Sequence, residues 1–471
     1  MQLIEKYVKR FFWVPFVLGM VGYWMVGDLP FVESIYASGT LYFVNPVEDL
    51  SNPWILLSKL LAMLVTTGFL LSALGHVLSR FRGVWINQFT DSVCVHSDQP
   101  CGEALAASVK HGYLAGDLSP QTTAGAHDHI FFYSDEKETL QRYLEQAGAL
   151  EGRRVYIGLK AMDPALLRDT RKLDVHYFHT LEITARTYWK QYSFYQEIAD
   201  EGREISVAFL NWNEVGEAVF KYGFMNNVYA LSQKVTCHIW GCTPTAAAFL
   251  SGLKTWNRDR IVIHDGDWRE STEELRDMDR VILTEEAPLS SIQTLLYLDK
   301  NLPIHFYSAS GTGYAELMDA PNLKEFGNLE EVLTDDNVRR EVLYRQAKLF
   351  HYDYVLHSEN RSCPSDFEQE METAWRALDG MKRSSNTARA DHYWIEEKLR
   401  EKGIREEELW EMEHIRWCRF HSVNHWSYAP ERDNSRRRHP LLVPYSQLDK
   451  KEKAKDGIYD ETIRNEIAKL L

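Results

Sequence analysis

Aromatic and basic side chains concentrate between His414 and Tyr445 of a 471-residue chain whose formal net charge is −15. The rings could stack on a planar base, each stack contributing about 1–3 kcal/mol, and the arginines could meet phosphates through charge-assisted hydrogen bonds. We therefore predict a site for an anionic, nucleotide-type ligand. Its candidate residues are Arg383, Asn386, His414, Arg416, Trp417, Trp426, Tyr428, Arg432, His439 and Tyr445.

A packed core with an ion-paired surface would also explain this stretch. Trp417 and Tyr445 could fill a small core, and the run "RRRH" at 436–439 could form a solvated face. The sequence leaves both interpretations open.

A second candidate site follows the apolar run "KVTCHIW" at 234–240. The next residues match the dinucleotide-binding spacing GxGxxG/A, with Gly241, Thr243 and Ala246 in the three small-residue positions. Asp265 lies 24 positions after Gly241, where a ribose-binding carboxylate belongs. Thr243 carries a Cβ where backbone should approach phosphate, so the fold could equally be a scaffold that binds nothing.

Catalytic motifs are absent from the sequence. It has no HExxH, GxSxG or P-loop, and a dehydrogenase would need a substrate domain with a proton donor that we do not find. The histidines are dispersed and are expected to be structural, and the six cysteines form no CxxC pair, which is typical of reduced thiols in cytosol. We predict no enzyme, no catalytic residue, no metal and, from the acidic balance, no nucleic-acid partner.

Between the N-terminal part of the chain and the C-terminal aromatic and basic stretch, short apolar runs alternate with helical patterns. Runs such as 92–96, 129–134 and 154–159 indicate buried strands of parallel sheets. We predict a degenerate Rossmann-like domain at 83–202, whose first turn "SDQPCG" lacks phosphate-binding glycines, and a second Rossmann-like domain at 203–335. Residues 336–471 are expected to form a mainly helical part.

Two apolar segments, 11–27 and 54–78, predict two transmembrane helices within a membrane domain at 1–82. Lysines and arginines flank this pair, whereas 28–53 contains acidic residues and neither Lys nor Arg. The positive-inside rule then places both termini in the cytoplasm. The apolar segment 30–44 could be an interfacial helix of a plain anchor or part of a pore.

Two stretches resemble known families. "YLAGD" at 113–117, ahead of "HDHIFFYSDEKETLQ", resembles a stretch of TrkA/RCK-type (TrkA-N) proteins, whose paired Rossmann domains bind nucleotides and regulate ion flux. "EHIRW" followed by "HWSYAPERD", "RRRHPLLVPY" and "LDKKEKAKD" resembles the RyR domain, the repeat first seen in ryanodine receptors. The RyR likeness begins at "KRSSNTARADHYWIEEKLREKGI", residues 382–404.

Together these resemblances imply a multi-pass protein of the bacterial inner membrane that senses a nucleotide signal, as proposed for such proteins in antiviral defence. The ligand would be a cyclic nucleotide, an ADP-ribose derivative or NAD, and the assembly a homo-oligomer, either dimer or tetramer. An effector that alters membrane permeability is the first hypothesis. A TrkA-like regulatory subunit or channel-like protein for potassium or other ions is the alternative.

Overall fold

The computed structural model describes residues 11–43, 51–117, 123–160, 162, 166–167, 174–197, 203–318, 320–453 and 459–470. The chain divides into two compact units, which we describe separately. The first comprises 1–94 with 113–127, and the second comprises 95–112 with 128–471.

Helices dominate the first unit: α2 (Trp13–Met20), the π-helix η1 (Val21–Val26), α3 (Phe31–Thr40) and the long α4 (Pro53–Ile86). Asn52 starts α4, because its side-chain oxygen accepts the amides of Trp54 and Ile55. Among the described residues, one helical segment, Pro53–Leu71, is long and apolar enough to cross a membrane. It lies at the position of the second predicted span.

The first predicted span is shorter and less regular than expected. Its apolar helix covers Trp13–Val26 and changes from α to π geometry at Val21. Asn52 donates a hydrogen bond of 2.8 Å to the Gly22 carbonyl in the π-helical part. The prediction of two spanning helices therefore stays a prediction. Segment 30–44 contains α3, while residues 44–50 lie outside the described residues.

A five-stranded sheet has the order β2-β1-β3-β4-β5. The strands are β1 (Val93–His96), β2 (Gly112–Leu114), β3 (Asp128–Phe131), β4 (Arg154–Leu159) and β5 (Asp174–His179). The pairs β3–β4 and β4–β5 are parallel. The intervening helical elements are α5 (Pro100–Ser108), η2 (Ala115–Asp117), α7 (Glu136–Gln146) and η3 (Ala147–Ala149), followed after β5 by α8 (Thr180–Gln191) and α9 (Phe194–Glu197).

A six-stranded parallel sheet follows, in the order β11-β10-β9-β6-β7-β8. Its strands are β6 (Glu204–Leu210), β7 (Lys234–Trp240), β8 (Arg260–His264), β9 (Arg280–Leu283), β10 (Ile304–Tyr307) and β11 (Leu323–Phe326). The helical elements between them are α10 (Glu214–Asn226), α11 (Pro244–Ser251), η5 (Trp268–Glu270), α12 (Thr272–Leu275), α13 (Leu289–Leu298) and α14 (Tyr314–Leu317). Counted along the chain, the order is 3-2-1-4-5-6, which is that of the Rossmann fold.

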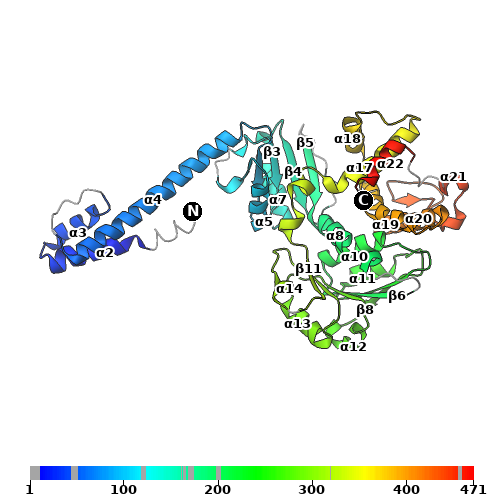
Figure 1. Ribbon diagram of the computed structural model, residues 1–471, viewed down its shortest axis with the longest axis horizontal. Helices are drawn as coiled ribbons and strands as arrows, with labels where there is room; N and C mark the ends of the chain where they lie inside the picture. The colour runs from blue at the N-terminus through cyan, green and yellow to red at the C-terminus, as the bar shows by residue number, and fades with distance from the viewer. Residues whose placement is uncertain are drawn as a thin grey trace. The chain divides into compact units, whose positions relative to one another are not determined.

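Alternating side chains bury both faces of this sheet. Val207, Phe209 and Ile239 join a core with α8, α10, α19 and α20, whereas Ala208, Leu210 and Trp240 join a core with η5, α12 and α13. In Figure 1, α10 and α11 accordingly lie on one side of the strands and α12 and α13 on the other. The predicted parallel α/β architecture is confirmed.

The remaining chain is mainly helical, as predicted. Its elements are α15 (Leu329–Val332), α16 (Asp335–Val338), η6 (Val342–Tyr344), α17 (Arg345–Ser358), α18 (Glu368–Ala377), α19 (Gly380–Glu401), α20 (Glu406–Val423), η7 (Tyr445–Gln447), α21 (Lys450–Lys453) and α22 (Glu461–Ala468). Two short strands, β12 (Ser427–Tyr428) and β13 (Arg438–His439), pair beside them.

Candidate functional site

Two exposed side chains lie after β1 and β3, where this strand order would place a ligand. The Asp98 carboxylate accepts the Ser134 amide at 2.8 Å and the Ser134 hydroxyl at 2.6 Å. A fixed negative charge there disfavours phosphate. This geometry agrees with the predicted degeneracy of the first Rossmann-like unit.

The switch point of the second sheet lies between β6 and β9, because the strand order reverses there. The exposed Asn213 caps α10 there: its side-chain oxygen accepts the amides of Val215 and Gly216, and its side-chain nitrogen donates to the Thr284 carbonyl at 2.7 Å. Those helix N-terminal amides are the donors that a phosphate would use. In this structure the two amides already have a partner within the protein.

The predicted turn at Gly241 follows β7, one strand away from that switch point. Gly241 has φ of +83°, which favours glycine, and the Thr243 hydroxyl accepts the Ala246 amide at 3.2 Å as the N-cap of α11. Asp265 is exposed just after β8. Nucleotide binding by Gly241, Thr243, Ala246 and Asp265 stays a prediction, at a location that the strand order does not favour.

Arg416, predicted to meet phosphate, is 1% exposed and is committed to an internal ion pair. Its guanidinium donates to both Glu413 carboxylate oxygens, at 2.6 and 2.8 Å. Glu413 also lies 3.6 Å from His392, whose second nitrogen donates to the Val228 carbonyl at 2.7 Å. Arg416 is thus part of the contact between α20, α19 and the second sheet domain, and its role in ligand binding stays a prediction.

The ion pairs around His392 are strong enough to keep it charged. Burial opposes the charge, but the carboxylates of Glu396 and Glu413 outweigh it and raise the pKa of His392 to about 9. Burial also opposes the charge of Glu413, yet Arg416 and His392 hold the pKa of Glu413 well below its ordinary value.

Several predicted residues do come together, as a partly buried aromatic cluster. Trp417 and Trp426 both contact His439, with ring centroids 5.0 and 6.2 Å apart. His421, which sequence reasoning missed, lies among them, 4.0 Å from the Trp417 ring. Burial lowers the pKa of His421 to about 3, so this ring is neutral and offers no cation to an anion.

His414 and Tyr445 extend the same packing. Their rings lie 6.0 Å apart, and His414 bonds the Val443 carbonyl at 2.8 Å. His414, His439 and Tyr445 are each at most 7% exposed. The interpretation that this stretch forms a small core agrees with the burial of these three residues, whereas Trp417 and Trp426 are half-buried and their role in ligand binding stays a prediction.

The other candidates lie outside that cluster. Arg383 donates to the Arg376 carbonyl and Asn386 to the Lys382 carbonyl, both near the start of α19. Arg432 is exposed and donates to Asn434 at 2.8 Å. Tyr428 is 56% exposed, which leaves its ring available to a ligand.

An open groove lies beside Tyr428. One wall is the loop after α11, and the other is formed by Tyr428 and the segment before and within η7. Its lining residues are Leu253, Lys254, Thr255, Trp256, Tyr428, Leu442, Val443, Pro444 and Gln447.

The groove carries aromatic rings and a cation, but different ones from those predicted. The Lys254 ammonium lies 5.5 Å from the Trp256 ring centroid, and Lys254 is exposed. Trp256 has φ of +64°, an uncommon conformation for tryptophan, and its indole donates to Ser422 on α20 at 3.2 Å. Because Trp256 and Tyr428 are 172 residues apart in the sequence, no local pattern reveals that they share a groove.

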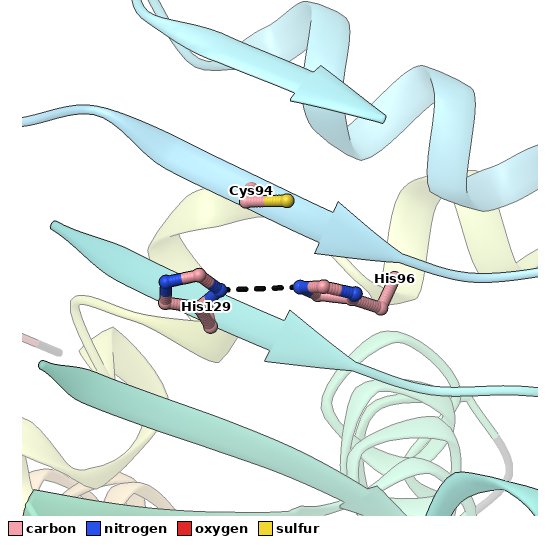
Figure 2. Close-up of side chains that lie close together, drawn as sticks. All are labelled: Cys94, His96 and His129. Atoms are coloured by element: carbon pink, nitrogen blue, oxygen red, sulfur yellow. Dashed lines mark hydrogen bonds between the residues drawn. The ribbon is translucent and has the colours of Figure 1, made fainter. Parts of the chain in front are cut away.

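Two histidines of the first sheet lie in its buried interior. In Figure 2, His96 at the end of β1 faces His129 on β3, and Cys94 lies two residues before His96 on the same strand. The two imidazoles are 3.1 Å apart and buried, and His96 stacks on Phe131 with centroids 4.0 Å apart. Burial and the neighbouring His129 hold the pKa of His96 well below its usual value.

Comparison with known proteins identifies one domain. Residues 397–470 match the RyR domain, so the predicted C-terminal RyR domain is confirmed over that range. No curated protein and no solved structure matches the chain. The fold and the comparison together define the class of protein: it has parallel α/β sheets and a mainly helical part that contains an RyR domain.

Proposed function

We propose that this protein is a membrane-anchored sensor and effector, in which a small nucleotide-type ligand binds the cytoplasmic RyR and Rossmann-like domains and alters membrane permeability. The observation that carries the proposal is the groove between the loop at 253–256 and the RyR domain. Its lining includes the exposed ring of Tyr428, the half-buried ring of Trp256 and the ammonium of Lys254. That combination suits a planar base with an attached phosphate.

The hydrogen bonds at the two switch points support this location. Asp98 places a carboxylate at one of them, and at the other Asn213 already accepts two helix N-terminal amides, so both are less favourable to a phosphate than the groove. The candidate ligands remain a cyclic nucleotide, an ADP-ribose derivative or NAD.

The packing of the first unit supports the membrane anchor. Its interior contains small and polar residues, with Ser34, Ser38, Ser58 and Ala62 fully buried. Ser58 on α4 donates to the Pro15 carbonyl on α2, and a Cβ added to Gly22 would lie 2.6 Å from Ile55. Small residues inside are typical of helices that pack in lipid, where apolar contact alone does not drive association.

The outward faces of these helices are apolar. The exposed side chains of α4 include Leu56, Leu57, Leu60, Met63, Leu64, Phe69, Leu70, Leu71 and Leu74. An exposed apolar surface of this extent requires lipid or another chain to cover it. We propose insertion into the bacterial inner membrane with both termini cytoplasmic, and assembly as a dimer or tetramer, because short spans line a pore only in several copies.

The test is ligand-dependent leakage from liposomes that contain the full chain alone. A panel of cyclic nucleotides, ADP-ribose and NAD is added while release of potassium and of a small dye is recorded. The proposal predicts release with at least one member and loss of that response in Lys254→Glu. Leakage only after a potassium transporter is added would favour the regulatory-subunit alternative, and a role in antiviral defence would then lose its basis.

A further inference from the structure

Two histidines and a glutamate converge at the edge of the second sheet. His238 lies on β7, His264 ends the edge strand β8, and Glu274 lies on α12. All three belong to the second unit. The Gly241 turn and the groove use none of them.

The sheet register explains why the imidazoles meet. Trp240 pairs directly with His264 across β7 and β8, so His238, two residues earlier, shares their face and lies diagonally opposite His264. Trp240 stacks on His264 with centroids 3.8 Å apart and planes 7° from parallel. This stack fixes the orientation of the His264 ring.

The hydrophobic core under α12 fixes the position of Glu274 next to the two imidazoles. Its neighbour Leu275 is fully buried among the residues that pack on this face of the sheet. The Glu274 side chain is 42% exposed, while those of His238 and His264 are 14% and 17% exposed. The group is therefore anchored on one side and open to solvent on the other.

The three ligand atoms have the spacing of a coordination triangle. Nδ1 of His238 lies 2.9 Å from Nε2 of His264, and Oε1 of Glu274 lies 3.4 and 3.7 Å from these nitrogens. A point equidistant from atoms with those separations is about 2 Å from each, which is the length of a zinc–nitrogen or zinc–oxygen bond. No atom needs to move far for one ion to contact all three.

A second buried group, around His392, has a different geometry. Its imidazole lies between the carboxylates of Glu396 and Glu413, and Glu413 is already paired with Arg416. Among the described residues, the His238 group has no such internal cation on its carboxylate and is partly open to solvent, so it is the better ligand set of the two.

We propose that His238, His264 and Glu274 bind one divalent transition-metal ion, with Zn²⁺ the best match, and leave its fourth position open to solvent. Two imidazoles and one carboxylate with an open position form a set that zinc accepts in proteins. The ion would join β7, β8 and α12, since each supplies one ligand. The inference is independent of the proposed nucleotide function.

Zinc content and cobalt absorption of the full chain in detergent test the site. The chain is first stripped with EDTA and then titrated with Zn²⁺ by calorimetry, and with Co²⁺ while visible absorption is recorded. We expect one strong equivalent per chain and the visible bands of a four-coordinate cobalt site. Glu274→Gln should weaken Zn²⁺ binding at least about tenfold, and His238→Gln with His264→Gln should abolish it.

Glu273→Gln is the matched control, because Glu273 lies on the same helix with its side chain 87% exposed and contacts Arg276 instead. It should bind like the parent chain. Equal zinc affinity and equal cobalt spectra in the parent, Glu274→Gln and Glu273→Gln chains would overturn the assignment, as would the absence of any strong equivalent. If the double histidine variant does not fold, the comparison of Glu274→Gln with Glu273→Gln still tests the metal site. Both glutamates are partly or largely exposed, so we expect these two variants to fold.

Discussion

The guanidinium of Arg419 on α20 lies 2.7 Å from the carboxylate of Asp259, in the loop that leads into β8. Arg419 is 1% exposed, and it also donates to the Thr255 carbonyl, the Phe224 carbonyl and the Asn257 side chain. One buried cation therefore organises the loop that forms a wall of the groove. The RyR domain and the second sheet domain meet through this contact.

Arg419→Ala should destabilise the protein strongly, because it leaves the buried Asp259 without its cation. The expected loss is about 3–5 kcal/mol of unfolding free energy, as when one partner of a buried ion pair is removed. Thermal unfolding of the full chain in detergent measures it. Arg432→Ala is the control, since Arg432 is exposed, and should change stability by less than about 0.5 kcal/mol. Equal midpoints for the two variants would contradict this account.

Stability should fall as the pH rises from about 6.5 to about 9, because His392 loses its proton in that interval. Its pKa is raised to about 9 in the folded chain, whereas an unfolded histidine titrates near 6.5. Below the pKa of the unfolded chain the proton is bound in both states, and the charged His392 makes its full contribution to the free energy of unfolding. As the pH rises above that pKa, this contribution declines, by about 3 kcal/mol in total.

Thermal midpoints recorded across that pH range check the His392 prediction. His392→Gln should be less stable at pH 6.5 and should lose most of this pH dependence. His425→Gln, a change at an exposed histidine, should keep it. A parent chain whose midpoint stays constant over this interval would show that His392 is not charged in the fold.

Gly223→Ala should destabilise the core beneath the second sheet. A Cβ at Gly223 would lie 2.3 Å from the Trp189 ring, and this indole is fixed by a 2.7 Å hydrogen bond to the Val219 carbonyl. Overpacking of this kind costs about 1–3 kcal/mol. Gly148→Ala is the matched control, because nothing lies within 4 Å of a Cβ there. The difference in thermal midpoint between the two variants measures the effect.

Much of the fold could be predicted because its signals are local. The apolar run at 154–159 becomes β4 with the same bounds, and the run 234–240 becomes β7. Strand order is set by contacts distant in sequence, so the sequence did not reveal that the Gly241 turn follows the second strand of the sheet rather than the first.

The candidate site was harder to predict, since burial decides which cations are available. Arg416 and Lys254 both appear as basic residues in sequence, but the first is paired inside the protein and the second is exposed beside Trp256. Residue type therefore indicated aromatic and cationic groups near the RyR domain, and their role in ligand binding stays a prediction. The particular residues depend on the contact between α20 and a distant loop.

The positions of the lysines and arginines predict the membrane topology. A reporter fused after residue 80 should be cytoplasmic, and one inserted near Asn45, which lies outside the described residues, should be external. Protease accessibility in intact cells and in inverted vesicles distinguishes the two. Cleavage of the C-terminal domain from outside intact cells would contradict the proposed orientation.

The central claim is that the groove beside Trp256 holds a nucleotide, and mass spectrometry of small molecules retained by the purified full chain tests it most directly. The parent chain should retain a nucleotide. The groove variants Lys254→Glu and Tyr428→Ala should retain at least about tenfold less of it. Asp265→Ala and Tyr354→Ala, the latter a control at an exposed tyrosine, should retain as much as the parent. Loss of the nucleotide in Asp265→Ala, with normal retention in both groove variants, would contradict the account and place the ligand at the Gly241 turn.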